Sequence, residues 1–247
     1  MKRLKKQALT VNNLQVAYYQ GGQGVPLLFL HGSFIRARTC GRALDLLARR
    51  YTVIALDIPA YGSSDTPQTD WSYVEYAAFL DAFLQELGLD TVVVAGYSMG
   101  GAIAFHLAAV SKRVRKLVLI DAAGIHGNVR KRRQNERQLK FYLTHPAYWA
   151  ALAILSRDIT QFTMKHLFDY QHMRRIRIAC FNSPNEEALR RITVPTTLIW
   201  ARDDWNIPIA KAYEFQKRIP QAKLEVVPGI HDWLIYDPKR LLEVDGM

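Results

Sequence analysis

Short apolar runs alternate with helical patterns along most of this chain, and that alternation restricts the fold more than any other feature. The runs lack the strict apolar and polar alternation of a strand with one wet face, so we expect strands that are buried on both sides. Short connections between runs and helices predict an α/β fold, with a mostly parallel central sheet and helices on both faces. The expected strands are 25–30, 51–56, 91–95, 114–120, 196–200 and 224–227, and the expected helices are 42–49, 73–87, 99–110, 210–218 and about 238–244.

The chain is expected to open with a β-hairpin. Two segments rich in apolar residues, 9–11 and 14–19, flank Asn12 and Asn13. Asparagine tolerates the positive φ angles of tight hairpin turns. Residues 9–11 and 14–19 are therefore predicted to pair as antiparallel strands.

The alternation stops between about Ile125 and Asn185, where the sequence becomes helical, aromatic and basic. A chain of 247 residues can form one domain with an insertion. We therefore predict a core made of residues 1–124 and 186–247, with residues 125–185 inserted as a helical cap. The alternative is a helical bundle that packs on one edge of the core, because aromatic stripes at helical spacing are more often core than binding pocket.

The charge is strongly positive, with 33 Lys and Arg residues against 22 Asp and Glu residues. The positive side chains cluster at residues 1–6 and 129–137. Neither cluster belongs to a helix-turn-helix, zinc-finger or RNA-binding pattern, so no nucleic-acid partner is expected and the clusters are interpreted as solvated faces. The remaining interpretation is a weak attraction to an acidic lipid surface or an acidic substrate.

The N-terminal positive cluster is not followed by a continuous apolar stretch, so a signal peptide is not indicated. No window has the apolar length of a membrane span. The two cysteines, Cys40 and Cys180, are too few for a disulfide framework. These features predict a soluble, cytoplasmic protein.

The strongest chemical signal is Gly96-Tyr97-Ser98-Met99-Gly100, which stands where an expected strand meets an expected helix. In a G-x-S-x-G nucleophile elbow the turn is so sharp that the residues two positions from the serine must be small. The serine oxygen then projects above the sheet, and the N–H of the next residue can stabilise an oxyanion. This context predicts Ser98 as a nucleophile and the Met99 N–H as an oxyanion donor. The alternative is a glycine-rich helix start.

On this motif the chain resembles the α/β-hydrolase family. His31-Gly32-Ser33-Phe34 is similar to the family's His-Gly-x segment, which implies that Ser33 supplies the second oxyanion N–H, with Phe34 as the close alternative. His31 itself is expected to hydrogen-bond the loop. The stretch DIPAYGSSD, residues 57–65, resembles a family turn with Ala60 in place of a glycine. We interpret it as a scaffold turn without a catalytic role, in which Asp57 and Asp65 cap backbone N–H groups.

The chain order of this family is nucleophile, acid, histidine. His231 follows the last expected strand, where family members carry the base, so the resemblance implies that His231 activates Ser98. Residues 200–208 resemble the family's W-G-x-x-D-x-x-x-P segment, and the match falls on Asp204 as the acid. Asp203 is then a loop-capping or solvated neighbour. Asp121 is the second candidate acid, because some family members carry the acid after that strand.

The resemblance implies a serine hydrolase of the carboxylesterase type that cleaves an ester of a small to medium, apolar substrate through an acyl-enzyme. The candidate substrate pocket consists of Phe34, Tyr97, Trp149 and Trp205. No metal-ligand spacing, P-loop or dinucleotide fingerprint occurs, so no metal and no cofactor are expected.

Three other functions remain open on the sequence. Ser-Met-Gly-Gly also resembles the family's C–C bond hydrolases of ring-cleavage products, although Tyr97, Phe34-Ile35 and Asp232 depart from their pattern. The fold also hosts non-catalytic ligand receptors that retain a triad. A lipase-like protein that acts at an acidic lipid surface is the last alternative.

Overall fold

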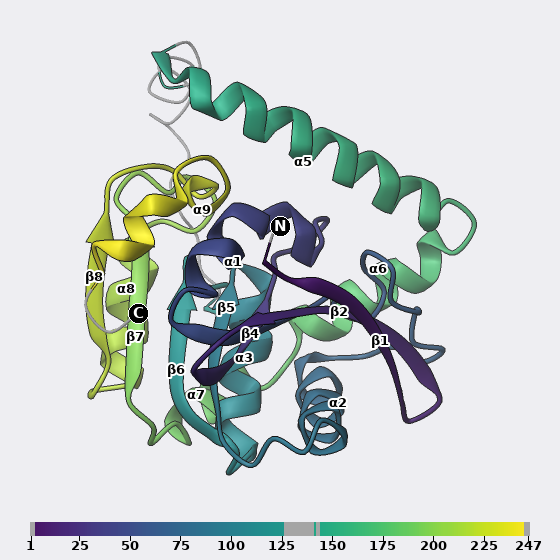
Figure 1. The fold of residues 1–247 in the computed structure, drawn as a ribbon. Helices are drawn as coiled ribbons and strands as arrows, with labels where there is room; N and C mark the ends of the chain where they lie inside the picture. The colour runs from purple at the N-terminus through teal and green to yellow at the C-terminus, as the bar shows by residue number, and fades with distance from the viewer. Residues whose placement is uncertain (1–2, 126–140, 142–143, 245–247) are drawn as a thin grey trace.

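The computed structural model describes residues 3–125, 141 and 144–244 and contains, in that part of the chain, an eight-stranded sheet (Figure 1). The strands are β1 (Lys5–Val11), β2 (Leu14–Gly22), β3 (Val25–Leu30), β4 (Tyr51–Leu56), β5 (Val92–Tyr97), β6 (Val114–Ile120), β7 (Thr196–Ala201) and β8 (Lys223–Val227). Their order across the sheet is β1-β2-β4-β3-β5-β6-β7-β8. The first three strands of this order pair antiparallel, and β4-β3-β5-β6-β7-β8 are parallel. The predicted mostly parallel sheet is confirmed.

The predicted opening hairpin is also confirmed. β1 and β2 pair antiparallel with Val11 opposite Leu14. The two residues between them, Asn12 and Asn13, have φ angles of 49° and 61°. Two consecutive left-handed residues form the turn whose twist matches that of the flanking strands, which explains the choice of asparagine.

Helices cover both faces of the sheet, as the unbroken apolar runs predict. Alternate strand residues point to opposite faces, so Leu28 and Val94 pack with α2 and α3 on one side, whereas Leu27 and Val93 pack with α1 and α9 on the other. The helices are α1 (Gly41–Leu47), α2 (Tyr73–Glu86), α3 (Met99–Val110), α5 (Pro146–Lys165), α6 (Tyr170–Phe181), α7 (Asn185–Arg190), α8 (Ala210–Arg218) and α9 (Trp233–Tyr236), with short 3₁₀ helices η1 (Ala37–Cys40) and η2 (Pro238–Leu242).

Several boundaries differ from those expected, among them the first strand, which begins at Lys5 rather than at residue 9, and two further differences bear on the fold and the site. The last helix, predicted at about 238–244, is instead the short α9 followed by η2, because Pro238 cannot continue a helix and starts a new turn. β5 extends two residues beyond the predicted end, to Tyr97. This extension matters for the site, because it fixes the face of the sheet to which Tyr97 points.

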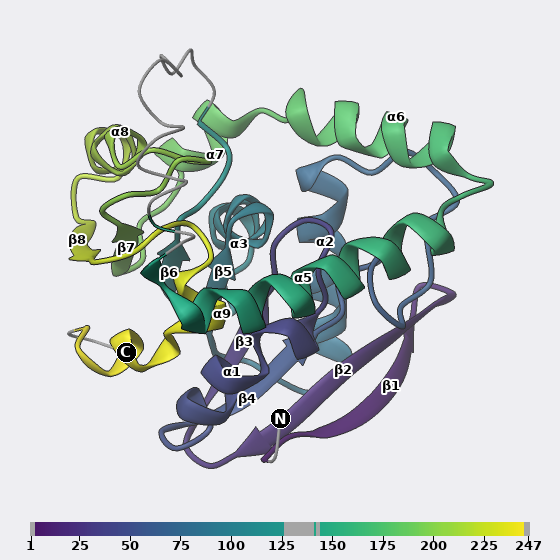
Figure 2. The ribbon, with the colours of Figure 1, turned by 90° about the horizontal axis from the view of Figure 1, so that it is seen from above.

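The segment predicted as a cap supplies α5 and α6, and α5 runs along the top of the molecule in Figure 1 and crosses the middle of the view from above in Figure 2. Residues 126–140 and 142–143 lie outside the described part, and the basic cluster 129–137 lies with them. α5 contacts α9 and η1, whereas α7 packs on α3 of the core. We retain residues 125–185 as the proposed extent of the cap.

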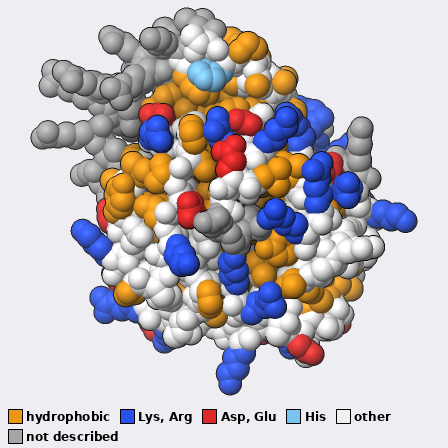
Figure 3. Space-filling model, turned by 60° about the vertical axis from the view of Figure 1, so that its left-hand side comes forward, with side chains coloured by type: hydrophobic (Ala, Val, Ile, Leu, Met, Phe, Trp, Pro, Cys, Tyr) orange, Lys and Arg blue, Asp and Glu red, His pale blue; other side chains and the backbone are white. Residues whose placement is uncertain are grey.

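Within the described residues, none of the helices combines the length and apolar character that crossing a bilayer requires. On the face shown in Figure 3, Lys and Arg side chains are spread over the surface rather than gathered in one patch.

Candidate functional site

Ser98 lies at the turn between β5 and α3, with φ 54° and ψ −119°. A positive φ is strained for a residue with a side chain, so the surrounding structure must hold Ser98 in place. The turn is also crowded. A Cβ atom on Gly96 would lie 2.3 Å from the Gly100 carbonyl oxygen, and one on Gly100 would lie 2.3 Å from the carbonyl oxygen of Leu30. Sterics therefore explain why both positions flanking the turn are glycines.

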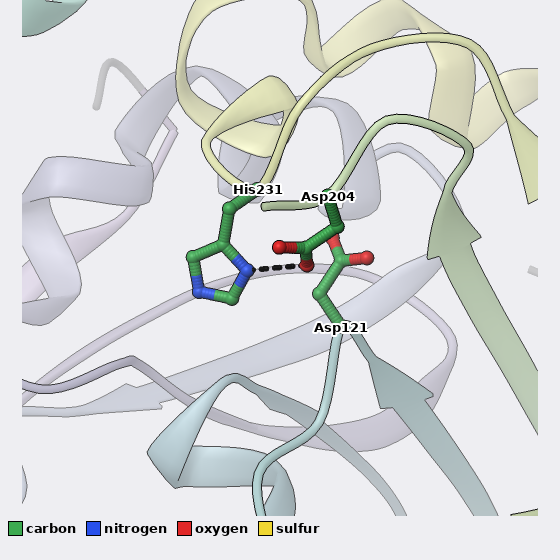
Figure 4. A group of neighbouring side chains, drawn as sticks. All are labelled: Asp121, Asp204 and His231. Atoms are coloured by element: carbon green, nitrogen blue, oxygen red, sulfur yellow. Dashed lines mark hydrogen bonds and ion pairs between the residues drawn. The ribbon is translucent and has the colours of Figure 1, made fainter. Parts of the chain in front are cut away.

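Three side chains from separate loops meet at this turn. The Ser98 Oγ lies 3.1 Å from Nε2 of His231, and Nδ1 of the same ring lies 2.6 Å from Oδ2 of Asp204 (Figure 4 shows the second contact). The other oxygen of Asp204 accepts the N–H groups of Asn206 and Ile207, at 2.8 and 2.7 Å. With Nδ1–H donating to the carboxylate, Nε2 is left to accept the Ser98 hydroxyl proton.

The environment of His231 favours proton uptake. Burial is the largest single effect and lowers the pKa of the imidazole, but the hydrogen bond and charge of Asp204, together with the charges of Asp121 and Asp232, raise the pKa of His231 to about 9. The ring can therefore accept a proton from the adjacent hydroxyl group and hold it as an imidazolium beside a carboxylate.

Asp121, the alternative acid, has other partners. It follows β6, and its oxygens accept the Ala201 N–H and the Trp233 indole N–H, both at 2.7 Å. Burial, followed by the nearby charge of Asp204, raises the pKa of Asp121 well above its ordinary value. Asp121 thus connects β6, β7 and α9, beside Asp204 in Figure 4.

The ligand-type atoms of Asp121, Asp204 and His231 lie within 4.8 Å of one another, a grouping that could hold a metal ion. However, all four carboxylate oxygens already accept N–H hydrogen bonds. We therefore interpret the group as a hydrogen-bond network. Asp203, the remaining candidate acid, is exposed, and its backbone N–H donates to Gly229.

The loop after β3 passes directly against Ser98. A Cβ atom on Gly32 would lie 3.2 Å from the Ser98 Cβ, so the following residue, Ser33, is next to the Ser98 turn. His31 fixes this loop. Its Nδ1–H donates to the Gly32 carbonyl at 2.8 Å, and its Nε2 accepts the Ile58 N–H at 3.0 Å. The backbone N–H groups of Ser33 and Met99 are therefore candidates to face a common oxyanion.

The DIPAYGSSD turn connects this loop to the rest of the core. The two oxygens of Asp57 accept the N–H groups of Ala37 and Ser63, at 2.9 and 3.0 Å. Asp65 accepts the Gln15 N–H at 3.0 Å. Both acids cap backbone N–H groups, as the sequence suggested.

A cavity of about 890 Å³ extends from the Ser98 turn to the cap. The neighbours of Ser98, rather than Ser98 itself, form its inner wall, namely Ser33, Phe34 and Met99. Phe162 of α5 closes this end, with ring centres 5.1 Å from Tyr61 and 5.2 Å from Phe34. The volume and the aromatic wall are typical of a site for a small organic molecule.

Of the four pocket residues expected from the sequence, only Phe34 lines the cavity. Tyr97 is buried on the opposite face of the sheet, where its hydroxyl donates to the His231 carbonyl and the Asp232 carboxylate, at 3.1 Å each. Trp149 is 53% exposed on α5, and Trp205 packs against Phe141.

Sequence reasoning also missed several wall residues. Tyr61 belongs to the DIPAYGSSD turn, and its aromatic side chain between small residues was the available signal. The other missed residues include Phe162 on α5 and, on α6, Tyr170, Arg174, Arg177 and Phe181. Their positions depend on how α5 and α6 pack against the rest of the chain.

Comparisons with known proteins agree with this architecture. A family model described as the alpha/beta hydrolase family matches residues 27–244. The 2-hydroxy-6-oxo-6-(2'-aminophenyl)hexa-2,4-dienoic acid hydrolase of Metapseudomonas resinovorans is 25% identical over 248 residues, which cover 93% of this chain and 85% of that protein.

Two solved structures have closely similar folds. A bacterial membrane phospholipase A superposes with a TM-score of 0.80 at 24% identity, covering 97% of this chain and 84% of that one. An esterase from Thermogutta terrifontis superposes with a TM-score of 0.79 at 20% identity, covering 97% and 96%. The expected fold class is confirmed.

Proposed function

Because this chain belongs to the alpha/beta hydrolase family, we propose that it is a serine hydrolase that cleaves a carboxylic ester of a small to medium, mainly apolar substrate. One observation carries the proposal. The Ser98 hydroxyl, the His231 ring and the Asp204 carboxylate form a continuous hydrogen-bonded chain at 3.1 and 2.6 Å. A hydroxyl, a base and an orienting acid in this order are the elements of nucleophilic acyl transfer.

In the proposed reaction, His231 accepts the Ser98 proton as Oγ forms a bond to the ester carbonyl carbon. The carbonyl oxygen becomes an oxyanion, stabilised by the N–H groups of Ser33 and Met99. When the tetrahedral intermediate collapses, the alkoxide departs with the proton from His231 and leaves an acyl-enzyme. Water then attacks the acyl group with His231 again as base, and the carboxylic acid is released with Ser98 restored.

Asp204 holds the imidazole in the required tautomer and stabilises the imidazolium during each proton transfer. Its two hydrogen bonds from Asn206 and Ile207 fix the carboxylate, so the histidine does not have to orient it during the reaction. The aromatic inner wall favours an apolar acyl or alcohol group. No step of this reaction requires a cofactor.

A second candidate is hydrolysis of a C–C bond. The relative from Metapseudomonas resinovorans is named for a 6-oxo dienoic acid, which contains no ester. The same nucleophile and base would serve such a reaction. The departures at Tyr97 and Phe34-Ile35 favour the ester.

The test is hydrolysis of p-nitrophenyl esters of increasing acyl length by the wild type and by Ser98→Ala, with mass-spectrometric mapping of a fluorophosphonate adduct. We expect an adduct on Ser98 and a loss of turnover of about 10³-fold or more in the variant. Ser156→Ala, an exposed serine on α5, is the matched control and should keep activity. Equal activity of Ser98→Ala would overturn the proposal. An adduct without ester turnover would favour the C–C bond hydrolase or a non-catalytic receptor.

A further inference from the structure

α6 presents two adjacent faces to its surroundings. One face packs against the core through Met173, Ile176 and Cys180, which are all buried and also border the cavity. The next face follows the helical spacing of four, three and four residues, and all its members line the cavity. These members are Tyr170, Arg174, Arg177 and Phe181. The outer part of the cavity thus carries two arginines between two aromatic side chains.

The two arginines differ from the other cationic side chains nearby. Arg175, on the same helix, pairs with Asp70 at 2.9 Å, and Lys211 in the cavity wall pairs with Glu214 at 3.0 Å. In contrast, the guanidinium groups of Arg174 and Arg177 form no hydrogen bond or ion pair with any residue in 3–125, 141 or 144–244. Both side chains are exposed, so two positive charges that those residues do not compensate stand at the solvent-facing wall of the cavity.

Arg177 also acts on the inner end of the cavity. Burial raises the pKa of Tyr61, and the Arg177 charge is among the smaller effects that oppose this rise. The Tyr61 hydroxyl lies 3.4 Å from the sulfur of Met99, the residue that follows the nucleophile. The Arg177 charge therefore acts on Tyr61, which lines the same cavity beside Met99.

We infer that Arg174 and Arg177 form an anion subsite, and that the substrate is an apolar ester with one carboxylate or phosphate group away from the scissile carbonyl. This inference rests on the proposed function for its substrate, although the subsite itself does not require turnover. The aromatic wall accommodates the apolar part, and the guanidinium groups bind the anion through charge-assisted hydrogen bonds. Carboxylate and phosphate groups each present two neighbouring anionic oxygens, which the guanidinium group of an arginine can bind through two parallel hydrogen bonds.

The first experiment compares two esters of equal length, p-nitrophenyl octanoate and the mono-p-nitrophenyl ester of octanedioic acid. The comparison is repeated with pairs of other chain lengths, each a neutral ester and the corresponding mono-ester of a diacid. At the best chain length, we expect the kcat/KM of the wild type to be at least about tenfold higher for the charged ester than for the neutral ester. In the double variant Arg174→Gln/Arg177→Gln, the ratio of the two kcat/KM values should fall to about one. In the matched control, Arg175→Gln, the ratio should stay at the wild-type value. Added salt should reduce the ratio. Absence of a preference at every chain length, together with weak binding in the next experiment, would overturn the inference.

The second experiment measures binding without turnover, in the Ser98→Ala background. Monomeric decyl phosphate, monomethyl sebacate and 1-decanol are titrated calorimetrically, with and without Arg174→Gln/Arg177→Gln. The subsite is supported if either anion binds more tightly than decanol and if the affinity for that anion falls about tenfold or more in the arginine variant.

Preference for decyl phosphate would indicate a lipid-type headgroup, and preference for the sebacate would indicate a free carboxylate. Equal binding of all three in both backgrounds overturns the subsite. Anion binding without ester turnover would instead retain the subsite and reject the ester hydrolase.

Discussion

The core and cap sides of the cavity are built by different kinds of contact. On the core side, backbone geometry fixes the site. Ser98 is held at a positive φ between Gly96 and Gly100, where no side chain would fit. On the cap side, side chains make the attachment. The buried Asp158 of α5 accepts a hydrogen bond from the Thr39 hydroxyl, and its Oδ1 lies 3.1 Å from the guanidinium of Arg36.

This difference separates two tasks. Backbone contacts in a close-packed core allow little displacement, so the positions of the reacting groups are defined by the core. The helix α5 buries Tyr148, Ala151 and Asp158, whereas most of its other residues are exposed, so we expect this helix to open locally without global unfolding. We therefore expect the core to determine the reaction and the cap to determine which molecules reach it. The following predictions test this separation.

The largest effect is expected from the acid on the core side. Asp204→Asn should lower kcat/KM by about 10³- to 10⁴-fold, because the amide cannot stabilise the imidazolium and can favour the other tautomer. Asp121→Asn should instead lower stability by about 1–3 kcal/mol, since its amide NH₂ would face a buried N–H, with a much smaller loss of activity. The kcat/KM and the free energy of unfolding in denaturant are measured for both variants and compared with those of the wild type. A larger activity loss in Asp121→Asn would reassign the acid.

The pH dependence tests the same network. The base must be neutral to accept a proton, so kcat/KM should fall as the pH drops through the pKa of His231. Because this pKa is raised to about 9, mainly by the hydrogen bond and charge of Asp204, the midpoint of the acid limb should lie above the ordinary value of 6.5. Asp204→Asn removes the largest of the contributions that raise the pKa, so its residual activity should have a midpoint at lower pH. Profiles of a neutral ester measure both midpoints, and identical midpoints would contradict the assigned role of Asp204.

The cap side should affect substrate binding more than chemistry. Phe162→Ala removes the ring that packs on Tyr61 and Phe34, and should raise KM for a long-chain ester by about tenfold or more with less effect on kcat. Trp149→Ala, half exposed and outside the cavity wall, is the matched control and should change KM by less than about twofold. If Trp149→Ala had the greater effect, the cavity would extend along the other side of α5.

The smallest effect should be a local loss of stability. Asp158→Asn weakens the ion pair with Arg36, whose side chain is 23% exposed, so the expected cost is about 1 kcal/mol. Hydrogen exchange followed by mass spectrometry should show faster exchange in α5 with little change in β5. Asp57→Asn, which places an amide NH₂ against one of the two backbone N–H groups that Asp57 accepts, should instead increase exchange in the strands around it. Uniform faster exchange in Asp158→Asn would show that cap and core open together.

The sequence predicted the features that depend on local constraints. The strands could be recognised because burial on both faces requires unbroken apolar runs, as in Val92–Tyr97. The sharp turn at Ser98 could be recognised because its sterics exclude all side chains at Gly96 and Gly100. The hairpin turn at Asn12 and Asn13 could be recognised for a similar local reason, because asparagine tolerates the positive φ angles that this turn requires.

Features that depend on packing between distant segments could not be predicted. Phe162 reaches the cavity only because α5 crosses the core at a particular angle, and the spacing of aromatic residues does not encode that angle. Tyr97 is different, because the alternation of Val93, Ala95 and Tyr97 along one strand face places it with α1 and away from the cavity. The expected end of the strand at residue 95 concealed this pattern.

The cap contacts near the DIPAYGSSD turn have an evolutionary consequence. His166 Nε2 donates to the Ala60 carbonyl at 2.7 Å, His172 Nε2 donates to the Pro67 carbonyl at 2.6 Å, and Lys165 reaches the Ser64 carbonyl. Every residue type has a carbonyl oxygen, so these attachments place no demand on the side chains of the turn. Substitutions in the cap therefore need few compensating substitutions in the core at these points. A lineage with this architecture could exchange or remodel its cap, and so acquire new substrates, while inheriting its reaction centre unchanged.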